Sequence, residues 1–445
     1  MSEPNNRLTR EELAKQEMDC TTVSRLCRAI LVLLFVILLL SVSAIQFAND
    51  MVQHAHGIRE DALPECARLR PLWEEAQQTF QRSEGSWFAR TVEANRSLLR
   101  EMEAYETRLE DNSWLTRMVL PQAQYFFTRR FGLGNEKVYC GQDDELFYRL
   151  DVDFVTDPGF LDPAQMHRRR LADTGSRIPL EPDPLPAIRQ FDRELNDLGI
   201  RLILLPVPAK PSIRAKGLYA RYPGGRLPQN PSYDEFLAVL CDEGIEVFDC
   251  RPILSDMEDE SFLKQDTHWT PAAAERTAEV LAEKILALNL LPEQSSMEYM
   301  RRAVGAANKG DTAVLLRLPP GTKRYGLERV ELQQVTRKDN TLWKSDPSAD
   351  VLLLGDSFSN IYSLLALNWG RSAGFAEQLS YHLQRPLDRI SFNDNGSYAT
   401  RRELARRLAI GQNPLQGKKV VIWEFTAREL AQGDWKKISI LPDAE

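Results

Sequence analysis

The distribution of apolar and polar residues divides the chain into three parts. An apolar run of about twenty residues, 29–48, contains no charged side chain. From residue 50 to residue 131, apolar residues recur every three or four positions among polar ones, which predicts amphipathic helices. Beyond residue 134, short apolar runs alternate with further amphipathic stretches, a pattern typical of an α/β domain.

The apolar run is long enough to cross a membrane at 1.5 Å per residue. Five Lys and Arg residues precede it, and few follow, so the positive-inside bias predicts a cytoplasmic tail at 1–28 and an outward-facing remainder. A cleaved signal peptide is the alternative, because "SVSA" at 41–44 resembles a cleavage site, but the run is longer than a typical signal core. We expect a transmembrane helix at 29–48, a helical stalk at 49–131 that packs on the main domain, and a catalytic domain at 132–445.

The main domain contains five apolar runs with strand character, and amphipathic stretches at 271–288 and 400–410 predict helices between them. Because the runs are continuous rather than alternating, the strands should be buried on both faces, as in a mainly parallel α/β/α sandwich. Active sites of such sheets collect at the carboxyl ends of the strands. The five predicted strands are 200–208, 245–250, 350–357, 387–393 and 418–425.

Composition narrows the possible functions. A net charge of −8 argues against a nucleic-acid binder, and 43% hydrophobic with 27% charged residues is ordinary globular usage. Of the six cysteines, Cys241 and Cys250 are close enough in sequence for a local disulfide, although spacing does not establish one. His54 and His56 have no third metal ligand nearby, so we expect neither a metal nor a cofactor.

A first candidate for chemistry lies in "LLLGDSFSN" at 352–360, where Ser357 follows a buried strand and precedes a helical stretch. A glycine permits the tight turn, and the helix N-terminus supplies free amides and a positive dipole, which suits a nucleophile. For an isolated G-D-S, a serine that only caps the helix is the commoner explanation.

The second candidate is "DTHWTP" at 266–271. Thr270 as N-cap and Pro271 at the first helical position explain the helix start, but they leave Asp266 and His268 unexplained. Two residues apart in an extended segment, these side chains should project to the same side, so that the carboxylate orients the imidazole toward a nucleophile. Together with Ser357, they predict a Ser-His-Asp triad.

With D-T-H-W at 266–269 ahead of G-D-S-F at 355–358, the chain resembles the SGNH-hydrolase-like domain of the alginate O-acetyltransferase family. That family consists of membrane-anchored or periplasmic proteins of bacterial exopolysaccharide systems, in which D-x-H precedes G-D-S. Further similarity lies at 132–148, 206–210 and 421–435, although Glu145 stands where the family usually has tryptophan. The resemblance implies that Ser357 accepts the acetyl group, that His268 is the general base and acid, and that Asp266 orients it.

The residues suggest further contacts. The backbone at Ser357 and the "NDNGS" loop, with Asn395 and Gly396, could supply oxyanion donors, although "DNG" is also an ideal turn. Lys210 and Arg428 follow predicted strands, where a cation could meet a uronate or a hydroxyl, and ordinary surface charge is the alternative for each.

We therefore expect a single-pass inner-membrane protein whose periplasmic domain O-acetylates an exopolysaccharide, alginate-like or other, through an acetyl-serine intermediate. Acetyl-CoA is absent outside the cytoplasm, so the resemblance implies a multispanning membrane O-acyltransferase as acetyl donor. One alternative is a polysaccharide deacetylase or esterase, which would use the same triad. A second is a non-catalytic polysaccharide-binding assembly subunit.

Overall fold

The computed structural model describes residues 24–57, 69–83, 85–172, 179–225, 227–293 and 298–441, so most of the expected cytoplasmic tail lies outside the described residues. The chain forms two compact units that divide between Leu120 and Pro121. This division lies inside the expected stalk, within helix α5 (Trp114–Phe131). We describe each unit by itself.

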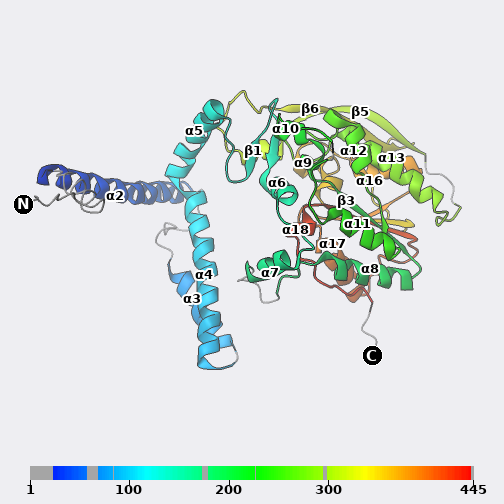
Figure 1. Cartoon of the computed structure of the whole chain (residues 1–445), viewed down its shortest axis with the longest axis horizontal. Coiled ribbons are helices and arrows are strands. Elements are labelled where there is room, and N and C mark those ends of the chain that lie inside the picture. The colour runs from blue at the N-terminus through cyan, green and yellow to red at the C-terminus, as the bar shows by residue number, and fades with distance from the viewer. Residues whose placement is uncertain are drawn as a thin grey trace, which may run out of the picture. The chain divides into compact units, whose positions relative to one another are not determined.

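The first unit consists of long helices: α2 (Arg25–Ala55), α3 (Arg70–Arg82) and α4 (Trp87–Asn112). Helix α2 reaches a mean hydropathy of 2.8 and is long and apolar enough to cross a membrane, a criterion that a signal sequence also meets. Helices α3 and α4 lie side by side (Figure 1), and the Thr79 hydroxyl donates to the Ser97 hydroxyl at 3.1 Å between them. The apolar spacing in this region thus correctly predicted helices.

The second unit is built on a five-stranded, fully parallel sheet in the order β4-β3-β9-β7-β8. The prediction of a parallel α/β/α sandwich is confirmed, because each of the five apolar runs overlaps one of these strands. Their bounds are β3 Arg201–Val207, β4 Glu246–Val247, β7 Val351–Gly355, β8 Asp388–Ser391 and β9 Val420–Thr426.

Helices cover both faces of this sheet because successive strand side chains point to opposite faces and both sets are apolar. One face packs against α13 (Pro271–Ala287) and α16 (Phe375–Leu383), and the other packs against α8 (Pro184–Asp197), α11 (Tyr233–Asp242) and α17 (Ala399–Ala409). Thr270 caps α13 by accepting from the Ala273 amide at 3.1 Å, as the sequence predicts.

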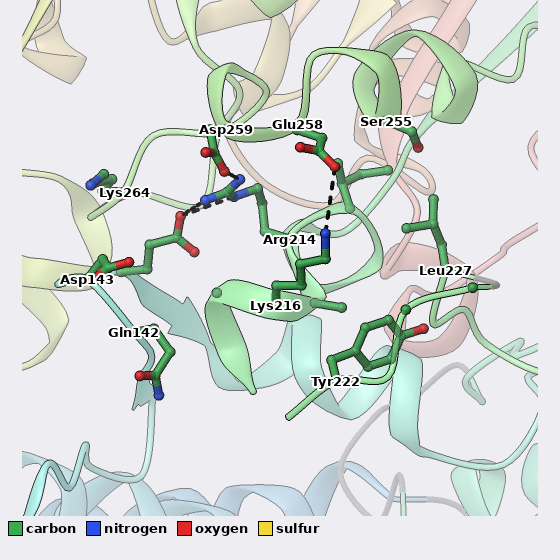
Figure 2. A pocket seen from close by; sticks show the side chains of 16 residues that line it. Gln142, Asp143, Arg214, Lys216, Tyr222, Leu227, Ser255, Glu258, Asp259 and Lys264 are labelled. Atoms are coloured by element: carbon green, nitrogen blue, oxygen red, sulfur yellow. Dashed lines mark hydrogen bonds and ion pairs between the residues drawn. The ribbon is translucent and has the colours of Figure 1, made fainter. Parts of the chain in front are cut away.

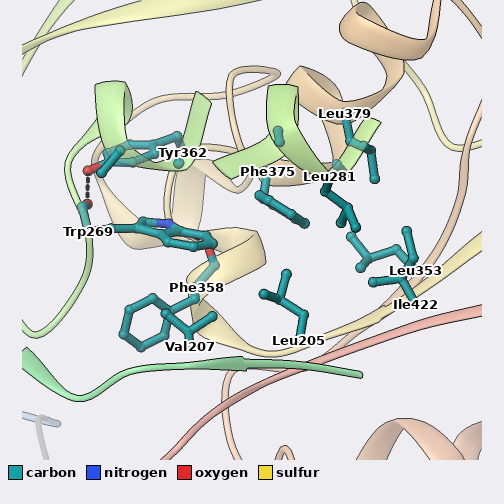
Figure 3. Close-up of a cluster of buried hydrophobic side chains, with 14 of the residues drawn as sticks. Leu205, Val207, Trp269, Leu281, Leu353, Phe358, Tyr362, Phe375, Leu379 and Ile422 are labelled. Carbon is teal, nitrogen blue, oxygen red and sulfur yellow. Dashed lines mark hydrogen bonds between the residues drawn. The ribbon is translucent and has the colours of Figure 1, made fainter. Parts of the chain in front are cut away.

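The apolar core between the sheet and helices α13 and α16 also holds the candidate site together (Figure 3). Trp269 is fully buried, and its indole donates to the Phe358 carbonyl at 3.1 Å, while the Tyr362 hydroxyl donates to the Trp269 carbonyl at 2.6 Å. Phe358 and Tyr362 both follow Ser357 closely in the chain, so the segment with Asp266 and His268 is fixed against the segment with Ser357.

Two antiparallel pairs lie outside the five predicted strands: β1 (Val138–Cys140) with β2 (Leu146–Tyr148), and β5 (Tyr299–Asn308) with β6 (Glu328–Arg337). The second pair is a partly exposed ribbon whose strands carry too few apolar residues to stand out from loop sequence. The remaining short helices are α6 Arg149–Thr156, α7 Pro163–Ala172, α9 Lys210–Ile213, α10 Ala215–Leu218, α12 Arg251–Asp256, α14 Asp311–Leu315, α15 Ser357–Asn360 and α18 Glu429–Gln432.

The disulfide considered for Cys241 and Cys250 is absent, because both are free thiols. Cys241 is exposed on α11, whereas Cys250 is fully buried, and its burial raises the pKa of the Cys250 thiol well above its ordinary value.

Candidate active site

Ser357 is the first residue of α15, directly beyond the carboxyl end of β7. Asp356 fixes the turn before it: one carboxylate oxygen accepts from the Phe358 amide and the other from the Thr426 amide on β9, both at 2.8 Å. The Asp356 amide in turn donates to the Glu424 carboxyl at 3.0 Å. The turn that presents Ser357 is therefore tied to the neighbouring strand and not only to its own helix.

Asp266, His268 and Ser357 form one hydrogen-bonded chain. Nδ1 of His268 lies 2.6 Å from Oδ1 of Asp266, and Nε2 lies 2.8 Å from Oγ of Ser357. Asp266 is 2% exposed and the other two are each 9% exposed, so the chain is nearly sealed and its aspartate end is the most deeply buried. An imidazole between a carboxylate and a hydroxyl can take the hydroxyl proton during attack on an acyl carbonyl.

The segment that carries Asp266 and His268 is a bend and not the extended stretch expected from the sequence. Oδ1 of Asp266 accepts from the backbone amide of His268 at 3.1 Å as well as from its ring, so the two residues close a local turn. The other oxygen, Oδ2, accepts from the Asp311 amide at 3.0 Å and from the Trp369 indole at 3.3 Å. All four contacts hold the carboxylate in one orientation.

A second carboxylate, Asp311, lies beside the imidazole. Its Oδ2 is 3.7 Å from Nδ1 of His268 and accepts from the Thr267 hydroxyl at 2.5 Å, and its Oδ1 accepts from the Thr267 amide at 2.8 Å. Sequence reasoning missed Asp311, because nothing in its spacing links it to residues more than forty positions earlier.

The charges of these groups shift one another's pKa. Burial disfavours the imidazolium, but the Asp266 carboxylate and its hydrogen bond outweigh burial and raise the pKa of His268. Burial likewise opposes ionisation of Asp266, yet the adjacent imidazole and two backbone amides lower the pKa of Asp266. Loss of hydration and the charge of Asp266 raise the pKa of Asp311 to about 6. The group best suited to remain an anion at neutral pH is therefore Asp266.

Asp266, His268 and Asp311 also offer ligand atoms within 4.8 Å of one another, the only such group among the described residues. Coordination of a cation by Nδ1 of His268 would replace the 2.6 Å hydrogen bond that this atom makes to Oδ1 of Asp266.

Lys210 is too deeply buried to contact a substrate, contrary to the expectation that it binds a uronate or a hydroxyl. Its ammonium is 1% exposed and donates to three backbone carbonyls at 2.6–2.8 Å, with the Asp266 carbonyl at 3.4 Å. Burial lowers the pKa of Lys210 to about 8. The residue is an internal support for the segment that leads into Asp266. The three carbonyls belong to Leu146, Leu263 and Lys264.

Arg428 fits the expected role of a cation near the substrate better than Lys210 does. Its guanidinium donates to Asp151 at 2.9 Å, lies 5.5 Å from the ring centroid of Tyr148 and is 16% exposed. Its charge is near enough to lower the pKa of His268, against the stronger effect of Asp266. The Arg428 guanidinium therefore lies near the His268 imidazole and is fixed in place by its ion pair with Asp151.

The expected oxyanion loop lies beside the nucleophile turn. A Cβ on Gly396 would come within 3.3 Å of Oδ2 of Asp356 and 3.0 Å of the Phe425 side chain, which explains the need for glycine. Asn395 is exposed with φ at +57°, and its carbonyl accepts from the amides of the next helix. Among the described residues, no acceptor bonds the Ser357 amide, so that amide is free to donate to an oxyanion.

Glu145, the departure from the family pattern, is buried and ion-paired with Arg214, which also binds Asp259. These side chains line a pocket of about 490 Å³ together with Lys216 and Tyr222 (Figure 2). The lining mixes both signs of charge, and its cations are largely engaged by carboxylates. Glu145, directly before β2, thus packs through an ion pair where an aromatic side chain would use apolar contact.

Comparison with known proteins identifies the family of the chain. Residues 171–427 match the family model described as SGNH hydrolase-like domain, acetyltransferase AlgX. The probable alginate O-acetylase AlgJ of Pseudomonas aeruginosa is 27% identical over 249 residues, which cover 55% of this chain and 62% of that protein. The protein of the same name from Pseudomonas putida is 31% identical over 144 residues, which cover 31% of this chain and 35% of that one.

Two solved structures are also similar. The O-acetyltransferase domain of Pseudomonas putida AlgJ is 21% identical with a TM-score of 0.49, covering 67% of this chain and 93% of that domain. Pseudomonas aeruginosa AlgX is likewise 21% identical with a TM-score of 0.45, covering 68% of this chain and 67% of that structure.

Proposed function

Since this chain belongs to the family of SGNH hydrolase-like acetyltransferases, we propose that it transfers acetyl groups to hydroxyls of a bacterial exopolysaccharide such as alginate, with Ser357 as the acetyl carrier. The observation that carries the proposal is the unbroken chain from Asp266 through His268 to Ser357, with heavy-atom distances of 2.6 and 2.8 Å. A non-catalytic binding subunit would need no such chain.

The reaction has two halves that use the same groups. Oγ of Ser357 attacks the acetyl carbonyl of the donor while Nε2 of His268 takes its proton, and the proton then passes to the leaving group of the donor. In the second half, a sugar hydroxyl attacks the acetyl-serine ester, His268 accepts the hydroxyl proton, and Oγ leaves with that proton. Asp266 holds the imidazole in one tautomer and stabilises its charged form in both halves.

Each tetrahedral intermediate needs hydrogen-bond donors for its oxyanion. The unpaired amide of Ser357 is the donor that the geometry favours, and the loop with Asn395 and Gly396 beside Asp356 is the nearest source of a second. Arg428, held by Asp151, supplies a positive charge near the same edge of the sheet.

The cellular location and the acetyl donor are the remaining parts of the proposal. We propose that α2 anchors the chain in the inner membrane with the acetyltransferase unit in the periplasm, which the charge distribution around residues 29–48 supports. Because acetyl-CoA is confined to the cytoplasm, a multispanning membrane O-acyltransferase would supply the acetyl group.

Trapping the acetyl-enzyme tests the role of Ser357. Full-length protein in detergent, mixed with an activated acetyl ester and quenched in acid, should gain one acetyl group that peptide mass spectrometry places on Ser357. Ser357→Ala should gain none, and His268→Ala should gain it far more slowly. Ser363→Ala is the matched control, because that hydroxyl donates to Glu377 and not to the imidazole, so it should acetylate normally. Acetylation of Ser357→Ala at the normal rate would assign the nucleophile elsewhere.

A further inference from the structure

An exposed aromatic cluster occupies the C-terminal half of α5, within the second unit. Phe126, Phe127 and Phe131 are 58%, 46% and 60% exposed, and their ring centroids lie 5.7–6.3 Å apart. Leu133, just beyond the helix, is 53% exposed. No residue described in this unit buries these side chains, although three adjacent aromatic rings form a much larger apolar patch than single surface residues do.

A basic cavity of about 430 Å³ adjoins the same helix. Arg129, Lys323 and Arg324 line it together with the hydroxyl residues Thr128 and Thr322, and no carboxylate does. Arg324 is ion-paired with Asp144 outside the cavity lining, whereas none of the described carboxylates lies within ion-pair distance of Arg129 or Lys323. The Thr128 and Thr322 hydroxyls already donate to backbone carbonyls, and Arg129 also donates to the Tyr125 hydroxyl at 2.9 Å. The positive charges of Arg129 and Lys323, neither of them ion-paired with a described carboxylate, are therefore what suits this concave site to a phosphate or another small anion.

The charge of α5 contrasts with that of the whole chain. The helix contains three arginines and no acidic residue, while the protein carries a net charge of −8. Exposed phenylalanines with Arg129 and Arg130 beside them supply the apolar and cationic groups that the surface of an anionic membrane attracts.

We propose that the aromatic cluster and the basic cavity together bind the surface of an anionic phospholipid bilayer. The cavity takes the phosphate of a lipid headgroup, and Phe126, Phe127 and Phe131 enter the boundary between headgroups and acyl chains. An acidic polysaccharide would also satisfy the cations, but a bilayer offers apolar surface to the phenylalanines as well. The inference rests on the proposed periplasmic, membrane-anchored location and not on the acetyl chemistry.

The test places a photoactivatable residue, p-benzoyl-phenylalanine, at Phe126 of the full-length chain. The protein is reconstituted in vesicles of phosphatidylcholine with or without 30% phosphatidylglycerol, irradiated and analysed for lipid adducts by mass spectrometry. The matched control carries the photoactivatable residue at Leu286, a side chain 46% exposed on α13. We expect lipid adducts at position 126 in the anionic vesicles and none at position 286.

Charge variants separate headgroup recognition from simple proximity to the membrane. One cation near an anionic surface contributes roughly fivefold in affinity, so Arg129→Glu with Lys323→Glu should lower the adduct yield by at least roughly 25-fold in the anionic vesicles. Arg129→Lys with Lys323→Arg preserves both charges and should label normally, which shows that any loss is not a folding defect.

The proposal would be overturned if no lipid adduct formed at position 126, if adduct yields were equal at positions 126 and 286, or if they were equal with and without phosphatidylglycerol. A further sample contains an acidic polysaccharide together with the anionic vesicles. Adducts with that polysaccharide in place of lipid would also overturn the proposal. Hydrolysis of an acetyl ester, measured on the same samples, reports separately on the proposed acetyl chemistry. Normal hydrolysis without lipid adducts would therefore refute the membrane surface alone.

Discussion

Asp311→Asn should reveal how much the second carboxylate contributes to His268. Asparagine keeps the shape of the side chain and can still accept from the Thr267 amide, and the Asp311 amide still donates to Asp266. The substitution therefore removes a charge 3.7 Å from Nδ1 with little change in geometry.

The size of the effect follows from that distance. Two unit charges at 3.7 Å interact by about 1 kcal/mol at the dielectric constant of water and by about 4 kcal/mol at an effective value near 20. The Asp311 side chain is 38% exposed, which places the interaction toward the lower figure. A difference of about 1.4 kcal/mol corresponds to one pKa unit, so the pKa of His268 should fall by about one unit.

The assay is the pH dependence of kcat/KM for an activated acetyl ester. A base works only when neutral, so the acidic limb of the profile should move to lower pH by about one unit in Asp311→Asn. The plateau should fall up to about tenfold, because the imidazolium formed during attack loses a neighbouring anion. An unchanged limb, or a limb that moves to higher pH, would refute the assignment.

Stability provides an independent check on the same residue. Because the folded protein raises the pKa of Asp311 to about 6, above its ordinary value near 3.8, the folded state favours the protonated form, and stability falls as the pH rises through this interval. The neutral asparagine avoids this loss. At pH 7, Asp311→Asn should unfold at a temperature a few degrees above that of the wild-type protein, with no gain at pH 3.5.

Three further predictions follow from burial: two concern the support of the site and one concerns the free cysteines. Lys210→Met should lower the free energy of unfolding by about 3 kcal/mol or more, measured by denaturant titration, because three buried carbonyls lose their donor, and a change below about 1 kcal/mol would contradict the assigned role. Glu424 is buried, and its burial beside Asp356 raises the pKa of Glu424 well above its ordinary value, so Glu424→Gln should keep most of the activity. Glu424→Ala should lower kcat about tenfold through the loosened turn, and equal activity of the two Glu424 variants would exclude that role. In the folded protein Cys241 should react with a thiol reagent, and Cys250 should react only after unfolding, as peptide mass spectrometry of the modified protein would show.

Much of the architecture was predictable because its signals are local. The continuous apolar runs predicted the parallel strands, and Thr270 with Pro271 predicted the start of α13. The juxtaposition of His268 with Ser357 was predictable only by combining two motifs, each of which has an ordinary structural explanation by itself.

The supporting residues were not predictable, because their roles depend on contacts between distant segments. The position of Lys210 after a strand is compatible with a surface cation, whereas in the structure its ammonium binds carbonyls of β2 and of the distant segment before Asp266. Glu145 finds its partner Arg214 across 69 positions, and neither residue has a spacing that suggests the pair. The role of Asp311 could not be predicted either, because Asp311 belongs to no recognisable motif and nothing in the sequence indicates that it lies beside His268.

The central claim is that Ser357 passes its acetyl group to a sugar. Full-length protein is incubated with an activated acetyl ester and chemically deacetylated alginate, and NMR measures acetyl on the polymer and free acetate. The wild-type protein should divert acetyl from acetate onto the polymer as polymer concentration rises, because a positioned hydroxyl attacks the acetyl-enzyme ahead of water. Ser357→Ala should form neither product. If the polymer never gains acetyl while acetylated polymer is stripped, the protein is an esterase and the transferase account is wrong.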